Sequence, residues 1–75
     1  MRIAESWTTK QFRVVIYTLE TQWYVEFEAG PMKQGYKFSK EKYATLADVH
    51  EALSPAFQTE VYEHFNRMFL SLKKV

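Results

Sequence analysis

The stretch QWYVEFEAG, residues 22–30, alternates two sets of side chains along the chain. One set is apolar and consists of Trp23, Val25 and Phe27; the other consists of Tyr24, Glu26 and Glu28. Alternation with a period of two, in aromatic and β-branched residues, predicts a strand that buries one face. The second set raises the question of what balances two carboxylates on the open face.

Two neighbouring segments have the same character and predict hairpins with this strand. They are KQFRVVIYTL (10–19) and GYKFS (35–39). Only Glu20 and Thr21 separate residues 10–19 from the central strand, and two residues are the length of a tight hairpin loop. The opposed residues are then expected to be Thr18–Trp23, Ile16–Val25, Val14–Phe27 and Phe12–Ala29.

The second hairpin contains a Gly-Pro turn marker. Its loop is predicted to be centred between Pro31 and Met32. The opposed residues are then expected to be Val25–Phe38 and Phe27–Tyr36. Because both hairpins place their apolar side chains on the same side, the sequence predicts an antiparallel meander of three strands in chain order.

These registers also place a cation beside each carboxylate of the open face. Arg13 is expected opposite Glu28, and Lys37 opposite Glu26. A cross-strand pair of opposite charges contributes about 0.2–1 kcal/mol. A catalytic carboxylate pair instead needs one carboxyl group whose pKa is raised by burial, which an open sheet face does not provide. We therefore interpret the two glutamates as structural.

Two helices are predicted after the meander. The first is TLADVHEAL, residues 45–53, in which Thr45 is an N-cap and Asp48 completes a capping box. The second, residues 54–75, opens with the cap and proline of Ser54-Pro55. Its apolar residues follow helical spacing over about 18 residues, or roughly 27 Å. They are Phe57, Val61, Phe65, Met68, Phe69 and Leu72.

These elements predict one α+β domain over residues 1–75. It is a two-layer fold in which a short helix and a long C-terminal helix pack on one face of the antiparallel meander. Whether residues 1–9 form a fourth strand is left undecided. RIAESWT could pair with residues 10–19, but a register that turns Trp7 towards the core also turns Glu5 inward.

Length and composition indicate whether the protein is expected to self-associate and whether it is expected in a membrane or in the cytoplasm. The chain has 75 residues, 47% of them hydrophobic, and no cysteine. A chain of this length buries only about 60–65% of its unfolded surface, so self-association is the expected source of added stability. No run reaches 18 apolar residues, and the opening MRIAESW lacks the apolar core of a signal peptide. We expect a cytoplasmic protein that does not enter a membrane.

Patterns typical of catalysis or metal binding are missing from the sequence. His50 and His64 do not have the spacing of a zinc site and are expected at the edges of helices. The chain has no cysteine, no Gly-x-Ser-x-Gly motif and too few glycines for a phosphate loop. We therefore expect neither an enzyme nor a bound cofactor or metal.

The open face of the predicted sheet is the first candidate contact surface. Its apolar residues, together with one helix residue expected to point to solvent, are Val15, Tyr17, Leu19, Tyr24 and Leu70. Charge also favours contact between copies, because residues 43–66 hold acids and no lysine or arginine, while the segments on either side are basic. The sequence thus predicts a small protein-interaction module, either a homodimer or the partner of another protein.

Nucleic-acid binding is the alternative. Lysines alternate with aromatic residues in MKQGYKFSKEKY, residues 32–43, as they do in single-strand binders. The candidate residues are Arg13, Lys33, Lys37, Lys40 and Lys42, with Tyr17 beside them. Lysines that protect a sheet edge from further pairing explain the same pattern, and Glu26 and Glu28 on that face disfavour a polyanion.

Overall fold

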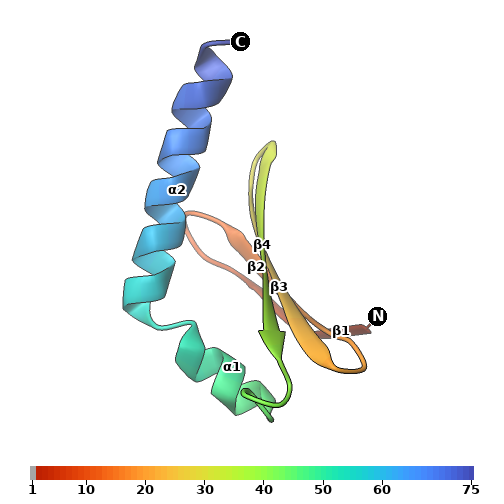
Figure 1. The fold of residues 1–75 in the computed structure, drawn as a ribbon. Coiled ribbons are helices and arrows are strands. Elements are labelled where there is room, and N and C mark those ends of the chain that lie inside the picture. The colour runs from red at the N-terminus through yellow and green to blue at the C-terminus, as the bar shows by residue number, and fades with distance from the viewer. Residues whose placement is uncertain (1) are drawn as a thin grey trace.

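Four antiparallel strands form one sheet in the order of the chain, and two helices follow them. The computed structural model describes residues 2–75. The elements are β1 (Arg2–Thr8), β2 (Arg13–Thr18), β3 (Gln22–Ala29), β4 (Met32–Ser39), α1 (Leu46–Ala52) and α2 (Pro55–Lys73). Figure 1 shows both helices on the same side of the sheet, with α2 continuing past the tip of the β3–β4 hairpin. The predicted two-layer α+β fold is confirmed.

The register of β2 and β3 agrees with the sequence prediction. Opposed residues include Val14–Phe27, Ile16–Val25 and Thr18–Trp23. Leu19 donates its backbone N–H to the carbonyl of Gln22 at 2.9 Å, which closes the two-residue loop. The predicted opposition of Phe12 and Ala29 falls just before β2 begins, although Phe12 is buried with the other residues of this face.

The register of β3 and β4 was predicted wrongly by two residues. Val25 lies opposite Tyr36 rather than Phe38, and Phe27 lies opposite Gln34. The loop is Gly30-Pro31, and Gly30 has a φ of +60°. The commonest two-residue hairpin loops contain a positive φ, which glycine adopts without steric cost. A shift of two residues keeps each side chain on its predicted face.

Residues 2–8 form a fourth strand, the possibility that the sequence left open. Trp7 lies opposite Val14 and Glu5 opposite Ile16, and the register shifts between Ile3 and Glu5. Both Trp7 and Glu5 therefore face the helices, as the sequence implied they would. Glu5 is accommodated at the edge of the sheet, where its Oε1 contacts Nε2 of His50 on α1.

Local capping sets the start of each helix. Thr45 accepts a hydrogen bond from the backbone N–H of Asp48, whose carboxylate accepts one from the N–H of Thr45. Ser54 Oγ accepts from the N–H of Phe57, and Pro55 occupies the first turn of α2. Both predicted caps are confirmed, and each satisfies backbone donors that the first turn leaves without partners.

The core lies between the helices and the inward face of the sheet. Its buried members are Phe12, Val14, Ile16, Trp23, Val25, Phe27, Val49, Leu53, Val61 and Phe65. Trp23 also donates its indole N–H to the backbone carbonyl of Tyr43 at 2.8 Å. This bond ties the segment before α1 to the centre of the sheet.

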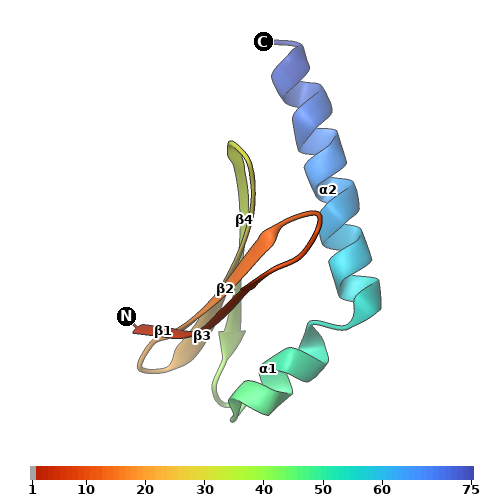
Figure 2. The ribbon, with the colours of Figure 1, turned by 180° about the vertical axis from the view of Figure 1, so that it is seen from behind.

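The apolar stripe of α2 extends further than the sheet that should cover it. Val61 and Phe65 are buried, and Phe57 and Met68 pack against the core. Phe69 and Leu72, predicted to join them, are about half exposed. Figures 1 and 2 show why, because the C-terminal part of α2 rises clear of the sheet. Within residues 2–75, neither helix combines the length and the hydropathy needed to cross a bilayer.

Candidate functional site

The face of the sheet that the helices leave open carries three rows of side chains. Opposed residues in an antiparallel sheet point to the same face, so the registers define these rows across all four strands. They are Ile3–Tyr17–Tyr24–Lys37, Ser6–Val15–Glu26–Gly35 and Thr8–Arg13–Glu28–Lys33. The first row is mainly apolar and the third mainly charged.

Two aromatic rings form the centre of the apolar row. The rings of Tyr17 and Tyr24 lie 5.9 Å apart between centroids and are inclined by 32°. The ring of Tyr24 extends over Gly35 on the edge strand β4, where a Cβ atom would come within 2.1 Å of its hydroxyl oxygen. Gly35 therefore leaves room for the ring, and the ring covers the edge glycine.

The structure brings together some of the predicted contact residues and separates others. Val15 lies beside the aromatic pair but is buried, while Tyr17 and Tyr24 are half-buried. Leu19 is half-buried in the turn after β2. Leu70 is exposed, as predicted, but it lies on α2 in the other layer of the fold. The open face is thus a surface without Leu70.

Ile3 belongs to this surface, and the sequence prediction missed it. It is opposite Tyr17 at the end of the apolar row and is 60% exposed. The sequence did suggest that this segment could form a fourth strand. The pairing register of that strand could not be predicted, because the shift after Ile3 interrupts the alternation of inward and outward side chains.

Both carboxylates of the open face lie near Lys33, which is neither of the two cations that the sequence predicted for them. Lys33 Nζ lies 3.9 Å from Glu26 Oε1 and 3.8 Å from Glu28 Oε2. Lys37, predicted to pair with Glu26, is opposite Tyr24 because of the two-residue shift in register. Arg13 is opposite Glu28 as expected. The structural interpretation of the glutamates therefore rests on Lys33.

The candidate nucleic-acid residues do not form one basic surface. Lys40 donates from Nζ to Thr18 Oγ1 at 2.8 Å and lies 4.8 Å from the centroid of Trp23, on the core side of the sheet. Lys42 Nζ lies 5.9 Å from the ring centroid of Tyr43. The other three, Arg13, Lys33 and Lys37, are on the open face with Glu26 and Glu28.

The two histidines lie on different helices and in different settings. The ring of His50 stacks on Trp7 with centroids 5.3 Å apart and contacts Glu5, so it joins β1 to α1. His64 is exposed on α2. In the part of the chain that the structure describes, no group of three or more His, Cys, Asp or Glu side chains could hold a metal ion.

A polar network crosses the space between β4 and α2. Tyr36 donates its hydroxyl hydrogen to Gln34 Oε1, and Gln34 Nε2 donates to the backbone carbonyl of Val61 at 2.9 Å. Burial, with a smaller contribution from the negative charge of Glu60, raises the pKa of Tyr36. The network links the two layers of the fold.

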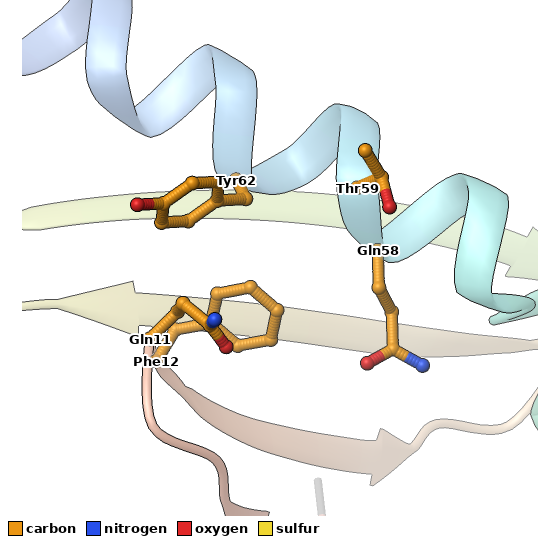
Figure 3. A pocket seen from close by; sticks show the side chains of 5 residues that line it. All are labelled: Gln11, Phe12, Gln58, Thr59 and Tyr62. Carbon is orange, nitrogen blue, oxygen red and sulfur yellow. The ribbon is translucent and has the colours of Figure 1, made fainter.

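The outer side of α2 carries three exposed apolar side chains, of which the sequence analysis named Leu70 as a contact candidate but not the other two. Tyr62, Phe69 and Leu70 are 44%, 48% and 58% exposed. Tyr62 also borders a hollow of about 150 Å³ together with Gln58 and the loop residues Gln11 and Phe12 (Figure 3). Their spacing along the helix was the available signal, because Phe69 and Leu70 follow Tyr62 by seven and eight residues, or about two helical turns.

A scan of protein-family models and searches of curated proteins and of solved structures found no match to this chain.

Proposed function

We propose that this protein is a small protein-interaction module that associates with a second copy of itself through the open face of the sheet. The observation that carries the proposal is the apolar row of Ile3, Tyr17 and Tyr24, which no helix covers. Aromatic side chains are enriched at the centres of protein interfaces, where they supply large contact areas at low entropic cost.

The distribution of charge on this face supports contact with a copy of the same chain. Arg13, Lys33 and Lys37 share it with Glu26 and Glu28. A two-fold contact brings the same patch of both copies together, so a patch with both signs of charge can be complementary to itself. The same mixture disfavours nucleic acid, whose binding depends on many uncompensated cations.

Cytoplasmic location is part of this proposal. Small domains of oxidising compartments are commonly stabilised by disulfides, which a chain without cysteine cannot form. Oligomerisation is another common way for a domain of this size to gain stability.

Sedimentation equilibrium in the micromolar range tests the proposal. The wild-type chain should sediment above the monomer mass, and Tyr17→Glu should reduce the mass, because it places a charge at the centre of the apolar row. Ala47→Glu adds the same charge at an exposed position of α1 and should leave the mass unchanged. A wild-type monomer, or equal masses for Tyr17→Glu and wild type, would reject the proposal, provided that circular dichroism shows both chains folded.

A further inference from the structure

A second stripe runs along α2 beside the buried stripe, and one of its flanks borders the loop between β1 and β2. Its members recur every three or four residues, with two adjacent residues at one step, which places them on one side of a helix. They are Thr59, Tyr62, Asn66, Phe69, Leu70 and Lys73, and all are exposed. Three of them are large and apolar: Tyr62, Phe69 and Leu70 are 44%, 48% and 58% exposed, although Lys73 Nζ lies 4.8 Å from the ring centroid of Phe69.

We propose that this stripe is a second contact surface, on which α2 packs antiparallel against α2 of a second copy, with the two-fold axis at Asn66. The contact lies on the opposite layer from the open face of the sheet (Figure 2). It goes beyond the function proposed above and does not depend on it.

The apolar side chains are arranged symmetrically about Asn66. In an antiparallel pair centred there, each residue meets the one that is equally far from position 66 on the other side. Tyr62 is four residues before Asn66 and Leu70 is four residues after it, so Tyr62 of one copy would lie level with Leu70 of the other across the contact. Asn66 would meet Asn66 of the second copy, and a carboxamide can both donate to and accept from its equivalent. A buried asparagine pair is also a known means of setting helix register.

Charge fixes the direction of the pair. Along one flank of the stripe, Glu60 and Glu63 precede Asn66, while Arg67 and Lys74 follow it. An antiparallel arrangement places Glu63 near Arg67 of the second copy, and Glu60 near its Lys74. A parallel arrangement would place equal charges beside each other, which is unfavourable.

The hollow beside Tyr62 gives the other flank a place for an aromatic side chain. Phe69 is seven residues after Tyr62 and therefore lies on the same flank, the one that faces the loop between β1 and β2. In the antiparallel pair, Phe69 of the second copy comes level with Glu63 and adjoins the hollow. Figure 3 shows this hollow between Gln58, Tyr62 and the ring of Phe12. A phenyl ring there would cover apolar surface that water now contacts.

Because the chain has no cysteine, a single introduced cysteine reports the geometry directly. Asn66→Cys should form a disulfide-linked dimer under mild oxidation, since the two-fold axis brings residue 66 against itself. Ser71→Cys, also exposed on α2 but off the stripe, is the matched control and should crosslink at least about tenfold more slowly. Equal rates for the two variants would overturn the proposal.

Sedimentation of full-length variants gives a second, independent readout. Leu70→Glu should weaken association at least about tenfold, whereas Ser71→Glu should not. Glu63→Arg and Arg67→Glu should each weaken it, and the double variant should recover it. Unchanged association in Leu70→Glu, or no recovery in the double variant, would contradict the antiparallel pair.

The two proposed contacts fail separately. Combining Leu70→Glu with Tyr17→Glu should yield a monomer if both surfaces associate. If the single variant Leu70→Glu is already a monomer, the helix contact is supported and the sheet contact is rejected. If Tyr17→Glu alone is already a monomer, the reverse holds.

Discussion

At the scale of single residues, Gly35 shows how the open face accommodates its largest side chain. The ring of Tyr24 occupies the space that any Cβ at position 35 would need, and the closest approach is to the hydroxyl end of the ring. A side chain at position 35 can therefore be accepted only if the tyrosine moves. The glycine has a conformational cost in a strand that the covering ring offsets.

This contact predicts that one substitution changes sign between two backgrounds. Gly35→Ala should destabilise the wild-type chain by about 1 kcal/mol, because the methyl group forces the Tyr24 side chain from its rotamer. In a Tyr24→Ala background the same change should stabilise by roughly 0.5–1 kcal/mol, because alanine costs less backbone entropy than glycine. Urea unfolding of the four chains measures both effects. A change of the same sign in both backgrounds would show that the ring does not rest on the glycine.

Tyr36 predicts a dependence of stability on pH in the alkaline range. Burial, and to a lesser degree Glu60, raises its pKa in the folded chain above the ordinary value. The folded state then holds a proton that the unfolded state has lost, so the free energy of unfolding should fall as pH rises above about 10. The fall should continue until the pH passes the folded pKa.

Comparison with Tyr36→Phe isolates this contribution, because the other titrating groups are common to both chains. Urea unfolding at a series of alkaline pH values should show a steeper decline for wild type than for Tyr36→Phe. Glu60→Gln should make the wild-type decline shallower. Identical slopes for wild type and Tyr36→Phe would mean that the phenol is not held neutral by the fold.

At the scale of elements, alternation and capping were the most reliable predictors. The β2–β3 register followed from the two residues between the strands, and both helix starts followed from their caps. The β3–β4 register was wrong because the Gly30-Pro31 marker is compatible with more than one loop position. Only the positive φ at Gly30 distinguishes them. The two-residue difference left each side chain on its predicted face of the sheet, but the cation beside Glu26 is Lys33 and not Lys37.

The limit of the α2 prediction has a simple cause. Helical spacing shows which side of a helix is apolar, but it does not show how far the opposing layer extends. Leu53, after α1, is 4% exposed, whereas Leu72 near the end of α2 is 48% exposed. For the same reason the sequence assigned Phe69 to the core stripe, although the side chain is 48% exposed.

These two leucines provide a matched test of where the core ends. Leu53→Ala should destabilise the protein by about 2–5 kcal/mol, since it leaves a cavity in a packed region. Leu72→Ala should cost under about 1 kcal/mol, because the side chain is already half in water. Thermal unfolding of both variants measures the two losses of stability. If Leu53→Ala does not fold, Leu53→Val should show a smaller loss that still exceeds the effect of Leu72→Ala.

At the scale of the whole molecule, the two layers diverge, and this leaves α2 with unequal support along its length. The body measures about 40 × 25 × 20 Å, with the helix along the long dimension. Its first half packs on the sheet through Phe57, Val61 and Phe65, while its last turns border the tip of the β3–β4 hairpin. Regions with few buried contacts open most readily.

Amide hydrogen exchange should therefore follow a gradient along α2. In dilute protein, protection is expected to be highest around Val61 and Phe65 and to fall towards Lys73. In concentrated protein, pairing of α2 should raise protection around Asn66 and beyond it, because bound copies are stabilised by mass action. Leu70→Glu should remove this dependence on concentration. Equal protection along the helix in dilute protein would contradict the unequal support.

The shift in register between Ile3 and Glu5 affects what kinds of assembly this chain can enter. β1 is an outermost strand, and such strands are natural templates for amyloid-like growth. An extra residue interrupts the regular ladder of amide and carbonyl groups that an incoming strand would need. Growth of a fibre from β1 would first have to remove this irregularity. The shift therefore disfavours the addition of further strands at this edge, but it does not hinder contacts made through side chains.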